Sequence, residues 1–277
     1  MKNLARSFVK PAGALLICFL LSLPAFGDDV AQSGRQIAAK WQDAVVTVQL
    51  VIKSGMSYEG GEGQKRESKT EATGTVIDAS GLTVISLAAT NPSEFFEEMM
   101  ASEDSEFKMN FSSEVTDVKI LLPDGQELPA NIVLRDKDFD LAFVRPKEKP
   151  AKTLAYVDFT KAVKPGLLDQ TVTLYRLGTV ASRSIAGCVD RIQSVVEKPR
   201  TYYVPGANSE SASLGAPVFA IDGNPIGVLL VRTRRTGPSE ESSWFSGMSG
   251  MGLTYMVLPA ADVLEAAKQA PETAEAK

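Results

Sequence analysis

Short runs of apolar and β-branched residues, separated by polar or glycine-containing turns, recur through most of the chain. The runs at 44–53 (AVVTVQLVIK), 115–122 (VTDVKILL) and 253–258 (LTYMVL) are typical of strands. Helical periodicity appears at residues 31–43 and at 260–270, the second opened by Pro259, and in a short apolar face at 95–100. Turn signals every 8 to 12 residues, roughly, with few helices between them, predict an all-β sandwich or barrel rather than a parallel α/β fold.

Two stretches depart from this pattern. Residues 54–71 are glycine-rich, polar and mixed in charge, and they predict a surface loop. Residues 91–113 carry six acidic residues and one lysine among phenylalanines and methionines, and they predict an acidic insertion folded over the body. Its acidic residues lie outside any known metal-binding loop pattern, so we interpret them as solvated charge and expect no metal.

The first 27 residues have the layout of a secretory signal peptide. Three basic residues, Lys2, Arg6 and Lys10, precede a short apolar core, and Ala25 and Gly27 form a small-x-small cleavage site. We expect an exported protein, periplasmic or secreted, with one domain over 28–270 and a tail at 271–277. The alternative is an uncleaved anchor, which would be the chain's one attachment to a membrane.

Composition excludes several chemistries. The 277 residues include no histidine, which excludes a Ser-His-Asp triad, a Cys-His dyad and a histidine-ligated zinc. The net charge is −5, and removal of the three basic residues of the leader makes it −8, which argues against general nucleic-acid binding. Cys188 has no partner once Cys18 leaves with the leader, and we interpret it as an inert core thiol.

The stretch SASLGAPVF at 211–219 has the layout of a nucleophile loop. It is followed by an apolar strand, an Asp222-Gly223 turn and a second strand, PIGVLLV. This arrangement resembles the GNSGGPL-strand-GxxIG signature of trypsin-like serine proteases, in particular the HtrA (Deg) group. In that group a serine three residues before the proline attacks the peptide carbonyl, and here that position is Leu214.

Three more segments are similar to the same family, in family order. In ATGTVIDASGLTVISLAAT (72–90) the family's histidine falls on Ala88, and in DGQELPANIVLRDKDFDLAFVRP (124–146) its aspartate remains as Asp140. GLTYMVLPAADVLEAAK (252–268) resembles the last strand and helix of the protease domain. The resemblance covers about residues 44 to 270 and implies a double six-stranded antiparallel β-barrel with a C-terminal helix. We expect no PDZ module after that helix.

The resemblance therefore implies a serine protease homologue that has lost its chemistry, a pseudoprotease. With Ala88 as the base position and Leu214 as the nucleophile position, Asp140 is left as a vestigial, hydrogen-bonded or solvated carboxylate. Ser213 and Ser211 are displaced from the expected site, and about 1 Å of displacement can cost a hundredfold in rate. Two alternatives stay open: a serine-type endopeptidase with an unconventional or partner-supplied base, and a structural envelope scaffold.

A lost nucleophile leaves the cleft available for binding. Family members bind substrate as an added strand, and the matching strand here is 227–233. Arg232, Arg234 and Arg235 could bind carboxylates, or they could form a solvated cationic turn, and Trp244 could be an exposed anchor or pack on the barrel. We expect a polypeptide or partner protein as ligand, and no cofactor. An open apolar cleft would favour binding, a plugged one scaffolding, and a serine within about 3 Å of a lysine or carboxylate there would favour catalysis.

Overall fold

The computed structural model describes residues 29–58, 64–91, 109–206, 208, 213–233 and 253–273. The expected leader, most of the expected insertion at 91–113 and the end of the tail lie outside these residues. Within them, no helix is long and apolar enough to cross a membrane.

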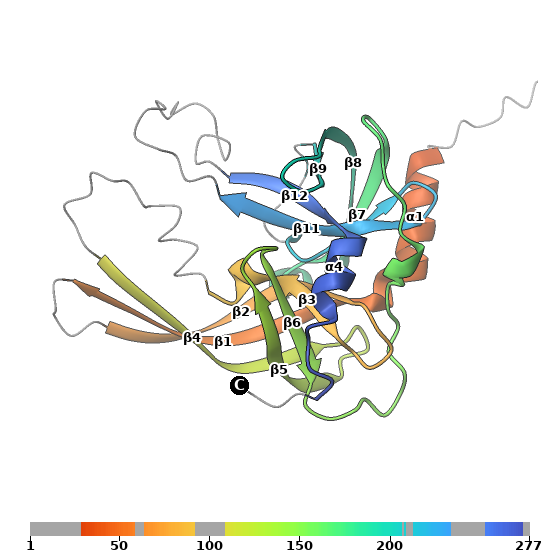
Figure 1. Cartoon of the computed structure of the whole chain (residues 1–277). Helices are drawn as coiled ribbons and strands as arrows, with labels where there is room; N and C mark the ends of the chain where they lie inside the picture. Colours follow the sequence, from red (N-terminus) through yellow and green to blue (C-terminus); the bar gives the residue numbers. More distant parts are fainter. Residues whose placement is uncertain are drawn as a thin grey trace, which may run out of the picture.

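Twelve strands among the described residues form two closed antiparallel barrels, as the sequence predicts. The first barrel has the order β1-β2-β3-β6-β5-β4 and the second β10-β11-β12-β9-β8-β7, and Figure 1 shows them one above the other. The strands of the first barrel are β1 (Val45–Tyr58), β2 (Gln64–Val76), β3 (Thr83–Ser86), β4 (Met109–Leu121), β5 (Glu127–Asp136) and β6 (Leu141–Pro146). Those of the second are β7 (Gln170–Arg176), β8 (Ile185–Val196), β9 (Tyr202–Pro205), β10 (Pro217–Ala220), β11 (Pro225–Thr233) and β12 (Leu253–Pro259).

Two helices and several short 3-10 turns complete the fold. Helix α1 (Asp29–Trp41) lies on the second barrel, where the Trp41 ring stacks on Phe219 at 5.7 Å and the Trp41 indole N–H donates to the Gly223 carbonyl. Helix α4 (Ala260–Ala267) follows β12 and buries Ala260, Val263 and Ala266. The 3-10 turns are η1 (Gln42–Ala44), η2 (Leu87–Ala89), η3 (Phe159–Lys161) and η4 (Thr179–Ala181).

Strands at the seam between the barrels are buried on both faces. In β6, Phe143 belongs to the core shared by both barrels, whereas its neighbours Ala142 and Val144 point into the first barrel. In β11, Leu230 lies in the shared core and Leu229 in the second barrel. Alternation of side chains therefore directs successive residues into two different cores, which explains why these strands read as continuous apolar runs.

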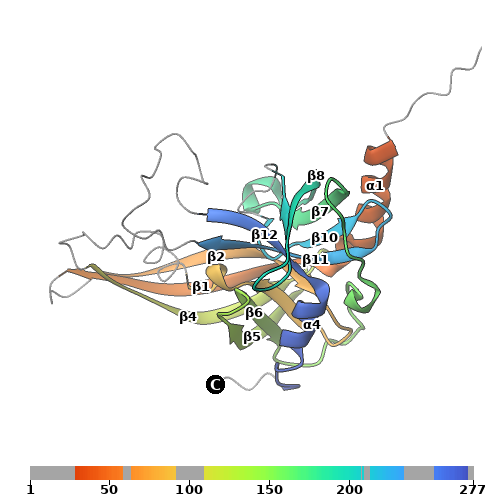
Figure 2. The ribbon, with the colours of Figure 1, turned by 45° about the horizontal axis from the view of Figure 1, so that its top comes forward.

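The prediction of a loop over 54–71 is wrong. β1 continues to Tyr58, and its pairing with β2 extends to Met56, which lies opposite Gln64. On the other edge of β1, β4 begins at Met109, which lies opposite Tyr58. The three strands form a long arm that projects from the body (Figures 1 and 2). Ladder hydrogen bonds satisfy the backbone here without a buried face, so a polar sequence forms strands that apolar periodicity does not reveal.

Candidate functional site

The histidine position and the aspartate position of the resemblance meet at the end of β3. Ser86 of β3 pairs with Leu141 of β6, and the Leu87 N–H then donates to the Asp140 carbonyl at 3.0 Å. Ala88 follows in η2, half-buried. The fold therefore brings the methyl group of Ala88 to the end of the strand pair that carries Asp140.

The loop that carries Leu214 packs against the same place. Gly215 has a φ of +85°, and a Cβ there would clash with the Thr73 carbonyl oxygen and lie 3.2 Å from the Ser86 backbone nitrogen. The Thr75 hydroxyl also donates to the Gly215 carbonyl at 2.8 Å. Only glycine fits such a close approach with a positive φ. Leu214, which is half-buried, therefore lies beside the segment that carries Ala88 and Asp140.

Asp140 is held by a neighbouring hydroxyl. The Ser86 hydroxyl donates to Asp140 Oδ2 at 2.9 Å, and Asp140 itself has a positive φ of 58°. This serine–carboxylate distance would satisfy the geometric condition for catalysis. However, Ser86 is fully buried, with 0% of its surface exposed, so its hydroxyl cannot contact a substrate. Among the described residues, this pair therefore provides no accessible nucleophile.

The serine next to the nucleophile position is also inaccessible. Ser213 is 1% exposed, and its carbonyl accepts from the Ala216 N–H at 3.0 Å. Ser211 lies outside the described residues. The groups at the old base and nucleophile positions are thus a methyl and an isobutyl group, neither of which can transfer a proton. Within the described ranges, no group of three or more acidic or cysteine side chains could hold a metal ion.

One edge of β11 is open in the part of the chain that the structure describes. β11 pairs with β12 along its length to Thr233↔Leu253, but its register with β10 ends at Val228. Leu229 then exchanges hydrogen bonds of 2.8 and 2.9 Å with Gly215 and Ala216 of the loop. Because backbone groups alternate along a strand, Val231 and Thr233 direct their N–H and C=O to the same edge as Leu229. Among the described residues, neither has a backbone partner on that edge.

A hollow of about 460 Å³ is lined by residues of β8, β9, the loop between them, β11 and β12, together with the loop that leads to Asp140. Its charged members are Asp138, Arg200 and Arg232, and its apolar walls are Val196, Pro199, Tyr202 and Met256. Arg232 donates to the Asp138 carbonyl and lies 5.0 Å from the centre of the Tyr202 ring. Arg232, predicted from the sequence as a candidate binding residue, therefore borders a real cavity. Arg234, Arg235 and Trp244 lie outside the described residues.

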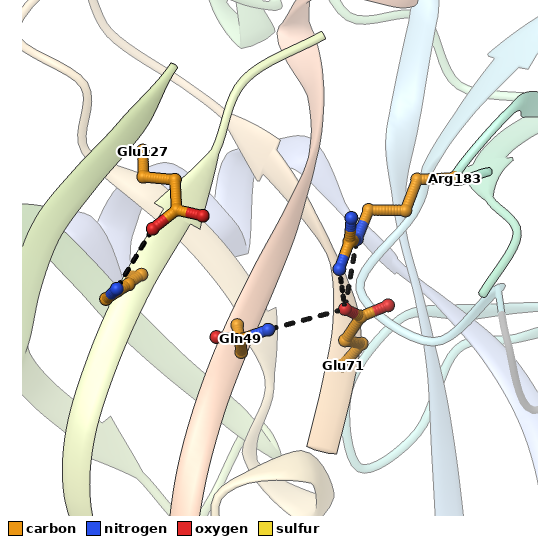
Figure 3. Close-up of polar contacts among 5 residues, drawn as sticks. Gln49, Glu71, Glu127 and Arg183 are labelled. Carbon is orange, nitrogen blue, oxygen red and sulfur yellow. Dashed lines mark hydrogen bonds and ion pairs between the residues drawn. The ribbon is translucent and has the colours of Figure 1, made fainter. Parts of the chain in front are cut away.

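A polar network borders the other flank of the centre. Arg183 of the loop between β7 and β8 reaches across the seam to Glu71 of β2, with its Nε and Nη2 at 3.0 and 2.5 Å from Glu71 Oε1 (Figure 3). Gln49 Nε2 donates to the same oxygen at 3.5 Å. Nearby, Lys119 and Glu127 pair at 2.9 Å, and this hydrogen bond and opposite charge raise the pKa of Lys119 and lower that of Glu127.

Several of these residues escape sequence reasoning. No motif position marks the side chains of Arg200, Asp138, Arg183 or Glu71 as part of a site. Glu71 and Arg183 are 112 positions apart in the sequence. Only closure of both barrels brings them together. Cys188, predicted to be a core thiol, is half-buried, and its thiol lies 3.4 Å from the Asn208 carbonyl.

Comparison with known proteins gives a distant sequence match. No protein-family model matches the chain. Among curated proteins, the chain is similar to Do-like protease 14 of Arabidopsis thaliana, with 26% identity over 170 residues. The match covers 59% of this chain and 36% of the relative, so the chain spans about a third of that protein's length.

Solved structures give a broader match. The crystal structure of Deg5 covers 85% of this chain and 92% of its own, with a TM-score of 0.54 and 14% identity. The MamO protease domain from Magnetospirillum magneticum covers 82% of this chain and 96% of its own, with a TM-score of 0.48 and 13% identity. Together with the two six-stranded barrels, the likeness to Deg5 establishes that the chain has an HtrA-like trypsin fold.

Proposed function

We propose that this chain is an exported, non-catalytic homologue of the trypsin-like serine proteases, a pseudoprotease that binds polypeptide in the former substrate cleft. The observation that carries the proposal is which residues occupy the three positions that match the catalytic residues of the family. Its three motif positions lie together around Gly215 and Ser86, yet they hold Ala88, Asp140 and Leu214, and the chain has no histidine. A preserved scaffold without a base or a nucleophile supports retention of binding and loss of hydrolysis.

The mechanism we propose is strand addition at β11. An extended peptide would pair with the backbone groups of Val231 and Thr233, and its side chains would lie beside the hollow at Arg232. Such binding needs main-chain hydrogen bonds and pockets, not a catalytic group. The hollow of about 460 Å³, with apolar walls and two arginines, supports binding over a purely structural scaffold.

The leader supports export. Residues 1–27 carry the basic, apolar and small-residue regions of a signal peptide, and we propose a periplasmic or secreted protein.

Incubation with unfolded casein tests the loss of hydrolysis. We expect no new peptide termini by mass spectrometry after overnight incubation of the purified mature protein, because no accessible nucleophile has a base. The Asp140→Asn and Ser86→Ala variants serve as matched controls, since they remove the one serine–carboxylate pair found at the centre. Cleavage by the wild type that either variant abolishes would overturn the proposal and indicate a serine-type hydrolase that works without histidine.

A further inference from the structure

The two arginine side chains that line the hollow make few hydrogen bonds and no close ion pair within the described ranges. Arg200 lies 4.5 Å from the centre of the Phe139 ring, and its Nη2 is 3.9 Å from Asp138 Oδ2, which is too far for a hydrogen bond. The Asp138 side chain is 82% exposed, so this ion pair contributes little. Within the described ranges Arg200 makes no hydrogen bond, and Arg232 makes one, to the Asp138 carbonyl.

Each of these guanidinium groups lies over the face of an aromatic ring. Phe139 lies against Arg200, and Tyr202 lies against Arg232. A guanidinium group that stacks on a ring keeps its N–H groups in the plane, free at the edges for a planar acceptor such as a carboxylate. The rings thus orient both side chains, and within the described ranges one hydrogen bond, from Arg232 to the Asp138 carbonyl, uses a donor of the pair.

Charge and polarity of the hollow favour an anion with an apolar stem. Its lining has two cations and one carboxylate, that of Asp138, in a protein whose net charge is −5. Burial raises the pKa of the nearby Asp262 carboxyl, and the positive charge of Arg200 lowers it by a smaller amount. Asp262 and Arg200 do not form an ion pair. The remaining walls are apolar, and the Arg200 side chain is 43% exposed, so solvent and an incoming ligand can both reach its charge.

We infer that this hollow makes the cleft selective for acidic peptides: a glutamate side chain of the strand added at β11 places its carboxylate between Arg200 and Arg232. The inference rests on the proposed strand addition, which would bring a peptide past Arg232. The carboxylate supplies the planar acceptor, and the methylene stem of glutamate lies on the apolar wall. A peptide C-terminus would offer the same carboxylate from a different source.

Peptide pools test the inference. The immobilised mature protein would be exposed to capped, C-terminally amidated hexapeptide pools, each with Glu or Gln fixed at one position and the other positions mixed. At one position we expect retention of the Glu pool to exceed that of the Gln pool at least tenfold, an affinity change equivalent to about 1.4 kcal/mol. Arg200→Gln should remove this preference. Arg191→Gln should keep it, because Arg191 bonds to the Leu168 carbonyl and lies outside the lining of the hollow.

The outcomes separate this inference from the proposed function. Equal retention of Glu and Gln pools would overturn acidic selectivity and leave peptide binding intact. Retention that depends only on a free C-terminus, in matched pools without the amide, would show that the hollow binds the end of a chain and would overturn the side-chain assignment. Retention of no pool would overturn both proposals. Thermal unfolding of Arg200→Gln beside the wild type shows whether a lost preference comes from the pocket or from unfolding.

Discussion

At the scale of single residues, the three positions that match the family's catalytic residues lie together, and two of them hold Ala88 and Leu214. Ala88 lies at the end of the β3–β6 pair with Asp140, and Leu214 lies in the loop that packs on Ser86. A histidine at position 88 would therefore have Asp140 as an orienting partner, and a serine at position 214 would have that histidine as a base.

This arrangement predicts a gain of hydrolysis in the Ala88→His/Leu214→Ser double variant. We expect casein cleavage at least about a hundredfold above either single variant, which is the low end of what a positioned base contributes. The measurement is the rate of appearance of new termini. Adding Asp140→Asn to the pair should reduce the gain, since the imidazole loses its orienting carboxylate. If the double variant stays inactive, more than the two side chains has been lost from the centre.

The sequence motifs point to three positions that the structure brings together, and they give no signal for the residues around them. Ala88, Asp140 and Leu214 follow from motif order, because each motif includes its own glycine or turn signal. Arg200 and Arg183 have no such signal, and their roles depend on contacts with Phe139 and Glu71 across the seam. Whether a serine such as Ser86 is exposed is likewise a property of packing, which a single sequence does not contain.

At the scale of elements, β11 has different partners on its two edges. The backbone groups of Leu230 face β12, whereas those of Val231 face the open edge beside the loop at Gly215. The N–H of Leu230 is thus part of a ladder, whereas that of Val231 has no backbone partner among the described residues.

Proline substitution distinguishes these edges. We expect Val231→Pro to keep the fold and lose retention of the mixed hexapeptide pool, because proline removes the N–H that a strand would accept. Val231→Ala, which shortens the same side chain and keeps the N–H, is the matched control and should still bind. Leu230→Pro should destabilise the protein by about 3 kcal/mol or more, through a lost ladder hydrogen bond and a lost buried side chain. Undiminished binding by a folded Val231→Pro variant would contradict strand addition at this edge.

The sequence predicts the elements well where burial dictates the pattern. Strands at the seam bury both faces, and the two helices have one buried face each, so each leaves a periodic or continuous apolar signal. The outer halves of β1, β2 and β4 leave none, since their stability comes from pairing with one another. Pairing between distant segments is a property of the folded chain, which explains why the arm was predicted as a loop.

At the scale of the whole molecule, the barrels share one core and are joined across the seam on both flanks of the centre. Phe143 of the first barrel and Phe219 of the second belong to the same apolar cluster. Arg232 contacts the Asp138 carbonyl on one flank, and Arg183 pairs with Glu71 on the other. These contacts fix the relative position of the barrels, and hence the width of the cleft between them.

A double-mutant cycle on Glu71 and Arg183 measures this coupling. The side chains are 19% and 38% exposed and share two hydrogen bonds to one carboxylate oxygen, so we expect a coupling free energy of about 1 kcal/mol. It should decrease in high salt, because the pair is only partly shielded from solvent. The Lys119–Glu127 pair lies within the first barrel and its glutamate is more exposed, so the same cycle there should give a smaller coupling. Coupling of zero for Glu71 and Arg183 would mean that this pair does not help to hold the barrels together. The shared apolar core and the other seam contacts, such as Arg232 with the Asp138 carbonyl, would then suffice, and the proposed peptide binding should persist in the Arg183→Ala variant.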